Sequence, residues 1–489
     1  MLRINKENIL GIILAVFFVL SLITDWYRLI ALASSLVVLI MVLDRLGKGI
    51  VLRELIALHS MFVCVLMPLV GYVFYDRTHH LALLWVKYMP IAEETYFAFC
   101  LPANVGFAMA ICWPLTKNNE SDGGENLNKL IERARFKLKS MHKISFYIML
   151  IGVVSFAFAD FLPEVIQFVF TLLFFSAFAG FLYLYFIPSF KRKVFVLTLF
   201  ALFIFVNAVQ SGMFTIVAYM GLTMFSFFFI GKKTVLWKKG LVFLIGLIFL
   251  FFLQIVKLSF RQQTWRQEFE GSKTVLFFEV VRDQVENFSW ENLSDAFFPI
   301  YARGNQGFNV CLVMRHIPNY QDFDGGKNLF INLMSSFVPR VFWPDKPKAG
   351  GKFNMAFYAG YHIEGWSTNV GPVGEAYGSF GVYGGIFYMV FLGGLIRWSY
   401  QVMMRLSRKT PLLLFWIPVI FYQVTYAAES DTLQILNSLI KSAFFVWLLY
   451  RFRPSLFGIL RIPITRLTAK KGAYAGKGIQ AADLRTGNG

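Results

Sequence analysis

The sequence has little charge and little cysteine. Only 15% of its 489 residues are charged, whereas 57% are hydrophobic. Water-soluble domains carry about 25% charged residues, so this composition excludes an ordinary soluble protein. The four cysteines form no CxxC pair, which excludes a disulfide scaffold and a thiolate metal site. The P-loop, GxSxG and HExxH motifs are also absent, so nothing indicates a P-loop NTPase, an α/β-hydrolase or a zinc protease.

Long apolar runs take the place of charge. They recur from end to end at about the length that crosses a bilayer core of about 30 Å as a helix. We predict an all-α, polytopic integral membrane protein with about twelve transmembrane helices, at residues 9–24, 29–43, 54–75, 96–115, 144–160, 165–187, 194–211, 213–230, 241–256, 379–396, 412–427 and 435–450. We predict a single membrane domain over 1–470. The small, polar and aperiodic residues 471–489 predict a disordered cytoplasmic tail.

Lysine and arginine are concentrated in every second gap between these spans. The rich gaps lie at 45–53, 117–143, 191–193, 232–239 and 397–409. The gaps 160–164 and 428–434 contain neither residue. Cytoplasmic loops of membrane proteins carry the excess of positive charge, so this alternation predicts that both termini are cytoplasmic.

One large outer loop, residues 257–378 between the ninth and tenth predicted spans, breaks the alternation. It carries twelve Lys and Arg residues. Long translocated segments are exempt from the charge rule, so topology does not explain these cations. They are therefore the candidate ligands for an anion outside the membrane.

The first of these cations follow the ninth span directly. Arg261 lies one helical turn after Lys257, so both point to one side of a helix. Two like charges placed together raise the energy unless an anion joins them, which favours a binding role for Arg261. Arg266 has two interpretations of equal weight: a ligand, or a side chain that keeps its stem in lipid and its head among the lipid phosphates.

Residues 295–317 have apolar side chains at helix-like spacing and are too short and polar to span the membrane. We predict an amphipathic helix that lies flat at the outer surface. Arg303 precedes a glycine, which would allow a ligand to approach closely, and Arg315 belongs to the same segment. The alternative is that these arginines are solvated on the polar face.

The stretch PRVFWPDKPKAGGKF, residues 339–353, places cations on a stiff backbone. Its three prolines fix the backbone dihedral angle at three points, and Trp343 suits the membrane interface. Such a frame predicts a preorganised anion site formed by Arg340, Lys346 and Lys348. The alternative is an interfacial anchor that binds lipid headgroups.

The stretch STNVGPVGEAYGSFGVYGG, residues 367–385, has glycines three or four residues apart, which give a helix one smooth face. Tight helix packing is the first interpretation of that face. Glu375 is a carboxylate at membrane depth and therefore a functional candidate. Either Glu375 or His362 could serve as a general base. His79 and His80 predict no metal site, because adjacent residues rarely supply two ligands.

In the segments FVPRVFWPDKPKAGGKF and STNVGPVGEAYGSFGVYGG the sequence resembles the Wzy-type polymerases of O-antigen and exopolysaccharide repeat units. It is also similar to them in span number and in one large loop before the last spans. The resemblance implies transfer of a glycan from undecaprenyl diphosphate to a lipid-linked repeat unit. The reaction takes place on the outer face of the bacterial inner membrane, with undecaprenyl diphosphate as the leaving group.

If the chain catalyses this reaction, cations of the large loop would bind the diphosphate. They are Arg261, Arg303, Arg340, Lys346 and Lys348, with Arg266 and Arg315 beside them. Glu375 or His362 would deprotonate the acceptor hydroxyl, and Trp343 and Tyr377 would stack on sugar rings. The implied partners are the lipid-linked donor and acceptor, the bilayer, a chain-length regulator and a flippase, with no nucleic acid, cofactor or metal. An O-antigen ligase and a non-enzymatic flippase for lipid-linked oligosaccharides are the alternatives.

Overall fold

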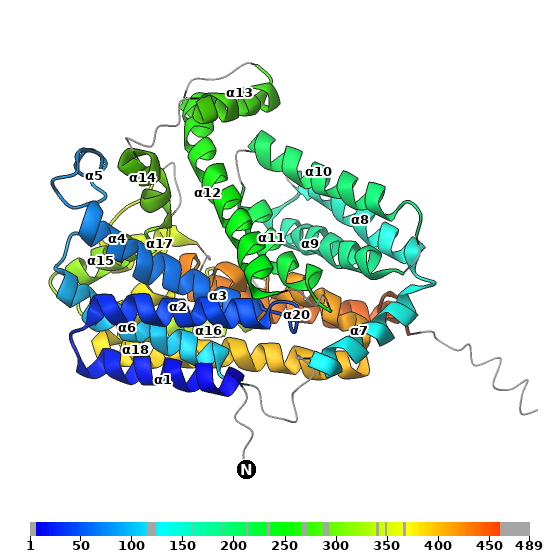
Figure 1. The fold of residues 1–489 in the computed structure, drawn as a ribbon, viewed down its shortest axis with the longest axis horizontal. Coiled ribbons are helices and arrows are strands. Elements are labelled where there is room, and N and C mark those ends of the chain that lie inside the picture. The colour runs from blue at the N-terminus through cyan, green and yellow to red at the C-terminus, as the bar shows by residue number, and fades with distance from the viewer. Residues whose placement is uncertain are drawn as a thin grey trace, which may run out of the picture.

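The computed structural model describes residues 6–114, 124–159, 161–188, 190–211, 214–231, 235–266, 271–286, 293–338, 342–347, 350–364 and 368–459. Over these residues the regular elements are all helices, and no strand forms (Figure 1). The predicted tail, 471–489, lies outside the described residues. The all-α prediction is thus confirmed for the described part of the chain.

Ten helical segments of the described chain are long and apolar enough to cross a membrane. They are α2 (Tyr27–Arg45), α3 (Leu52–Met61) continued through a π-helix (Phe62–Leu66) into α4 (Met67–Phe74), α6 (Glu93–Cys112), α8 (His142–Ala159), α9 (Glu164–Phe186), α10 (Lys193–Ser211), α12 (Leu236–Arg266), α18 (Gly371–Lys409), the segment Pro411–Glu429 formed by η3 (Pro411–Trp416), α19 (Ile417–Ile420) and η4 (Val424–Glu429), and α20 (Thr432–Phe452). Each overlaps a predicted span. The chain therefore has the architecture of a multi-pass helical membrane protein.

Two predicted spans coincide with shorter helices. The predicted span 9–24 is α1 (Lys6–Ile23), and 213–230 is α11 (Thr215–Phe228), which has 14 residues. At 1.5 Å per residue, α11 is about 21 Å long, shorter than the hydrocarbon core. Outside the spans and the segment between α12 and α18, the chain forms the short α5 (His80–Leu84), the amphipathic α7 (Gly124–Leu138) and η5 (Pro454–Phe457).

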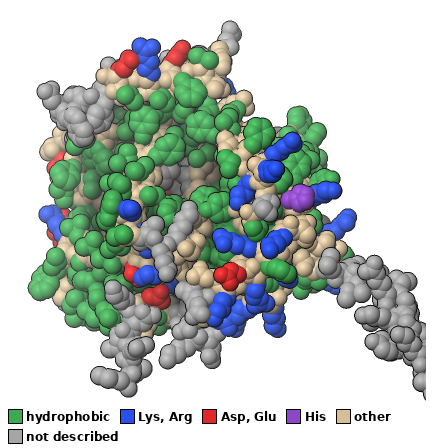
Figure 2. Space-filling model, turned by 45° about the vertical axis from the view of Figure 1, so that its right-hand side comes forward, with side chains coloured by type: hydrophobic (Ala, Val, Ile, Leu, Met, Phe, Trp, Pro, Cys, Tyr) green, Lys and Arg blue, Asp and Glu red, His purple; other side chains and the backbone are tan. Residues whose placement is uncertain are grey.

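Large hydrophobic side chains are exposed along α10 and α12, including Leu199, Leu202, Leu241, Leu244, Ile245 and Ile248. Figure 2 shows a broad hydrophobic face, with Lys and Arg side chains gathered toward one side. Exposed cations lie on α7, in the turn after it and at the start of α8: Arg133, Arg135, Lys139 and Lys143. An apolar surface of this extent is typical of a protein that contacts lipid.

The segment between α12 and α18 is helical rather than extended. It contains α13 (Lys273–Glu286), α14 (Leu293–Gly304), α15 (Gln306–His316), α16 (Lys327–Phe337) and α17 (Gly351–Ala359). The predicted single helix over 295–317 is two helices, because Asn305 caps α15 by accepting a hydrogen bond from the Phe308 backbone N–H (3.1 Å). Figure 1 shows α5, α14 and α15 at one end of the bundle, on the left.

The glycine face of α18 packs against neighbouring side chains. A Cβ on Gly378 would clash with the Tyr358 ring, and a Cβ on Gly385 would lie 2.8 Å from the Phe99 ring. These glycines therefore let α17 and α6 approach α18 closely, as the packing interpretation predicts. Gly381 has φ +68°, a left-handed conformation that breaks α18 and that glycine adopts without strain.

Candidate functional site

Aromatic contacts fix α14 against the segment that follows α4. The helix packs against α12, α4 and α5. The Tyr301 hydroxyl donates a hydrogen bond to the backbone carbonyl of Lys87 (2.7 Å), and the Tyr301 ring stacks on Tyr75 with centroids 4.3 Å apart. Arg303, two residues later, is thereby carried into the space beside α3 and η4. The cation thus has a defined place although it belongs to the long connecting segment.

Arg303 pairs with a carboxylate from a distant part of the chain, and that carboxylate also contacts a histidine. Its Nη2 donates to Oε2 of Glu429 at 2.7 Å, and Oε1 of Glu429 lies 3.2 Å from Nε2 of His59. The side chains of Glu429 and His59 are each 14% exposed, and that of Arg303 is 52% exposed. His59 lies within the span Leu52–Phe74. The contact therefore places Arg303 among the membrane helices.

Three further cations converge on Arg303. Lys257 of α12 is within electrostatic reach of Arg261, Arg303 and Glu429, and Arg261 is within reach of Arg303. Lys87 feels the charge of Arg303 as well. We call these groups the cationic cluster: Lys87, Lys257, Arg261, Arg303, Glu429 and His59.

Lys87 lies outside the membrane-spanning segments, and its ammonium releases its proton more readily than that of an ordinary lysine. Burial lowers the pKa of its ammonium, and the positive charge of Arg303 lowers that pKa further. Its Nζ lies 4.3 Å from the centre of the Phe308 ring, which compensates part of the lost hydration through a cation–π contact. An anion beside Lys87 would favour the protonated form.

The cationic cluster has an excess of positive charge. Among the described side chains of the cluster, four cations and one carboxylate give a formal charge of +3 with His59 counted as neutral. Like charges in a partly desolvated site raise the energy of the protein. A phosphate or diphosphate relieves this repulsion, because guanidinium groups bind its oxygens in pairs and ammonium groups act as point charges. The arrangement is thus suited to bind a concentrated anion.

The structure brings together two of the predicted cations, Arg261 and Arg303. Arg315 is exposed on α15 and donates to the Tyr361 hydroxyl (3.1 Å), away from the cluster. Arg340 and Lys348 lie outside the described residues. Arg266 ends α12, but its side chain is not among those described.

Lys346 has a different environment from the one predicted. It is 7% exposed, and its Nζ donates to the backbone carbonyls of Ser335 (2.8 Å) and Val338 (2.7 Å). These carbonyls belong to the end of α16, where helices leave acceptors unpaired. Lys346 thus caps the end of α16 in this structure, and its predicted contact with an outer anion stays a prediction. Trp343 is partly exposed.

Tyr377 is a packing residue. It is 8% exposed, and its ring contacts Phe99 and Phe323 with centroid distances of 5.1 and 5.8 Å. A ring enclosed in this way has no face for a sugar, so the predicted stacking role does not fit this conformation. His362 is exposed in the loop after α17, and none of the described residues forms a hydrogen bond or ion pair with it.

Glu375 is a buried hydrogen-bond acceptor. Its side chain is fully buried, Oε1 accepts from Asn354 Nδ2 (2.9 Å), and Oε2 accepts from the backbone N–H (2.8 Å) and hydroxyl (2.6 Å) of Thr432. In this structure the carboxylate joins α18 to the start of α20. Its role as a general base stays a prediction.

Asp431 extends the same network. Its Oδ1 caps α20 by accepting from the Gln434 backbone N–H (2.6 Å), and its Oδ2 accepts from the backbone N–H of Gly350 and from Asn369 Nδ2 (both 2.9 Å). Burial raises the pKa of Asp431, and these hydrogen bonds oppose the rise. Asp431 thereby ties the start of α20 to Gly350 and to Asn369.

Four cluster residues were not predicted as site residues: His59, Lys87, Lys257 and Glu429. Each is a single titratable residue in or beside an apolar run, which is a recognisable sign of function in a membrane protein. The sequence did not indicate their partners, because 370 residues separate His59 from Glu429. Tertiary contact alone groups them.

Comparison with known proteins gives one match. The family described as a domain of unknown function (DUF8712) matches residues 126–405, more than half of the chain. That range includes Lys257, Arg261 and Arg303, but His59, Lys87 and Glu429 lie outside it. No curated protein and no solved structure matches the chain.

Proposed function

The chain belongs to the DUF8712 family, and we propose that it polymerises undecaprenyl-diphosphate-linked oligosaccharide repeat units into a surface polysaccharide. In this proposal α1 and α11 complete a set of about twelve spans in the bacterial inner membrane. Both termini are cytoplasmic, and the long segment between α12 and α18 faces the periplasm. The product is an O-antigen, a capsule or an exopolysaccharide.

The cationic cluster is the observation that carries the proposal. The reaction releases undecaprenyl diphosphate, whose charge is concentrated on two phosphates at the membrane. Preorganised cations stabilise charge that develops on a leaving group, and partial desolvation strengthens each contact. Lys87, Lys257, Arg261 and Arg303 come from three separate segments, and their mutual repulsion is relieved by such a ligand. Aromatic packing of α14 holds the site in place before the ligand binds.

In the proposed transfer, one glycosidic bond forms and the bond from the donor sugar to the diphosphate breaks. The acceptor sugar hydroxyl attacks the anomeric carbon of the donor glycan, and a base takes its proton. The bond from that carbon to the phosphate oxygen breaks, and undecaprenyl diphosphate leaves with the electron pair. Arg303 and its neighbours bind the departing oxygens. His362 remains the proposed base, because it is exposed and Glu375 is buried.

A flippase for lipid-linked oligosaccharides is the second candidate. It is favoured by one observation. The ionisable residues His59, Lys257 and Arg261 lie on the candidate membrane-spanning helices themselves and not in the loops. A flippase needs charge at membrane depth to carry a headgroup across. An O-antigen ligase would use the same lipid-linked donor and differ in its acceptor.

A glycan ladder from cells with and without the gene tests the proposal. Loss of the ladder, with a single capped repeat unit remaining, supports polymerase, because export and attachment still operate. Loss of all surface glycan, including the single unit, refutes polymerase and supports a flippase or ligase. An unchanged ladder refutes all three.

A further inference from the structure

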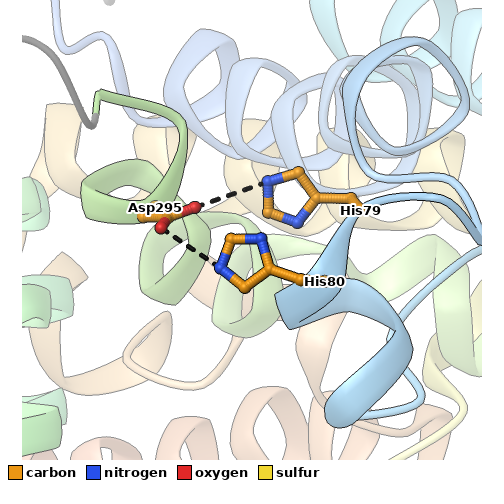
Figure 3. Close-up of side chains that lie close together, drawn as sticks. All are labelled: His79, His80 and Asp295. Carbon is orange, nitrogen blue, oxygen red and sulfur yellow. Dashed lines mark ion pairs between the residues drawn. The ribbon is translucent and has the colours of Figure 1, made fainter.

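Two adjacent histidines face one aspartate where α5 meets α14. Figure 3 shows the rings of His79 and His80 directed at the carboxylate of Asp295. His79 Nε2 lies 3.6 Å from Oδ1, and His80 Nε2 lies 3.2 Å from Oδ2. The three ligand atoms lie within 4.8 Å of one another. The packing of α5 against α14, rather than sequence spacing, brings the three residues together.

The backbone explains how neighbouring residues reach a common point. Side chains of consecutive residues in a helix diverge by about 100°. His79 is instead extended (φ −74°, ψ 120°), and His80 is the first residue of α5. Their rings therefore stack, with centroids 5.0 Å apart and planes inclined by 18°.

We propose that His79, His80 and Asp295 bind a divalent transition-metal ion, with zinc(II) preferred. Two imidazole nitrogens and one carboxylate are a common zinc ligand set, and bonds of about 2.0 Å at tetrahedral angles place ligand atoms about 3.3 Å apart. His79 lies 3.6 Å from one oxygen of Asp295 and His80 lies 3.2 Å from the other, and one ligand atom from each residue lies within 4.8 Å of the other two, so small side-chain rotations bring the set to that separation. The fourth position is left for water. Magnesium and calcium prefer all-oxygen sites, so they should bind weakly.

Charge favours a metal ion over simple ion pairs. The His79 side chain is 14% exposed, and its Nδ1 is buried without a hydrogen-bond partner among the described residues. A metal ion on Nε2 would leave the ring proton on Nδ1, so this unpartnered nitrogen does not by itself favour the ion. Protonation of both rings would stack two positive charges against a single carboxylate. A metal ion uses neutral rings and the carboxylate together.

The surrounding contacts hold the ligands before any ion binds. The Tyr75 hydroxyl donates to the carbonyl of Ser294 (2.7 Å), next to Asp295, and the Tyr75 ring contacts the His79 ring edge-on at 4.9 Å. The His80 side chain is 68% exposed, so an ion has a path to the site. A bound ion would join α5 to the first turn of α14. Arg303 lies eight residues further on, about 12 Å along the helix, so the metal site stands independently of the cationic cluster.

The test measures zinc binding directly. Full-length protein is purified in detergent, stripped with a chelator and titrated with zinc chloride by calorimetry. We expect one zinc ion per chain in the wild type and at least tenfold weaker binding in Asp295→Asn and His80→Ala. His142→Ala is the matched control, because this exposed histidine lies at the start of α8, and it should bind as the wild type does.

Thermal unfolding supplies a second readout that also reports folding. Zinc should raise the unfolding midpoint of the wild type and of His142→Ala, and leave that of Asp295→Asn unchanged. Asp295→Asn keeps the side-chain shape, so it should remain monodisperse. Equal zinc affinity in the wild type and both site variants would overturn the proposal. So would zinc binding in which His142→Ala loses as much affinity as His80→Ala.

Discussion

Nη2 of Arg303 lies 2.7 Å from Oε2 of Glu429, and 126 residues separate the two. The pair joins the segment after α12 to the end of η4, and His59 contacts the other carboxylate oxygen. Glu429 pairs with Arg303 and interacts electrostatically with Lys257, and the described part of the cluster keeps an excess of positive charge. Glu429 therefore orients Arg303 and leaves the cationic cluster able to bind an anion.

Replacing Arg303 tests the proposed role of the cluster. Arg303→Gln removes a cation from the departing diphosphate, and we expect polymer formation to fall by about 10²- to 10³-fold, as for loss of one preorganised donor. Arg303→Lys should retain part of the activity, because an ammonium keeps the charge but not the paired hydrogen bonds. The measurement is the glycan ladder, together with the amount of protein in the membrane.

Arg282→Gln is the matched control for this change. Arg282 is exposed on α13, where it pairs with Glu286 on its own helix (2.7 Å). Its loss should leave the ladder intact, because surface pairs of this kind contribute little. Equal ladders from Arg303→Gln and Arg282→Gln, at equal protein levels, would refute the assignment of Arg303.

Lys87 should make anion binding dependent on pH. Burial and Arg303 lower the pKa of Lys87 in the free protein, and a bound anion raises it again by favouring the ammonium. Between the two pKa values binding takes up a proton, so affinity falls as pH rises, by up to about tenfold per pH unit. Calorimetry with inorganic pyrophosphate from about pH 7 to 10 measures this slope.

Lys87→Arg isolates that contribution. Arginine keeps its proton over this pH range, so the variant should have a shallower slope than the wild type. His59 and Lys257 are present in both proteins, so only the difference between the two slopes reports on Lys87. Identical slopes would show that Lys87 does not contact the anion.

Glu375→Gln should act on stability. The carboxylate accepts three hydrogen bonds from Asn354 and Thr432, and a glutamine would turn an NH₂ group toward one of these donors. We expect a loss of about 1–3 kcal/mol in the free energy of unfolding, the usual effect of an unsatisfied buried group. The exposed Glu364→Gln is the control. A fully stable Glu375→Gln that is inactive would instead restore a catalytic role.

The glycine face of α18 can be tested with alanine at two positions. Gly378→Ala places a methyl group against the Tyr358 ring, whereas Gly394→Ala meets nothing within 4 Å. We expect Gly378→Ala to cost about 1–3 kcal/mol of stability through overpacking, and Gly394→Ala to be neutral or slightly stabilising in the helix. Thermal unfolding in detergent compares the two, and equal midpoints would contradict close packing at Gly378.

Much of the architecture could be predicted from local pattern. A run of apolar residues long enough to cross a bilayer needs no partner to be recognised, so ten predicted spans coincide with ten apolar helices. The contacts of single cations in the long segment could not be predicted in the same way. Lys346 caps α16, and Arg315 pairs with Tyr361, because each position depends on how several short helices pack.

The sequence by itself determined the helical membrane architecture and the places where charge is scarce. Both follow from local transfer energetics, since each helix satisfies its own backbone hydrogen bonds and each apolar run favours lipid. Only the tertiary structure decided which charges meet. Glu375 is buried, Glu429 pairs with Arg303, and His79 lies beside His80 with its ring toward Asp295. Those pairings arise between residues tens to hundreds of positions apart, whose contacts depend on the packing of whole helices.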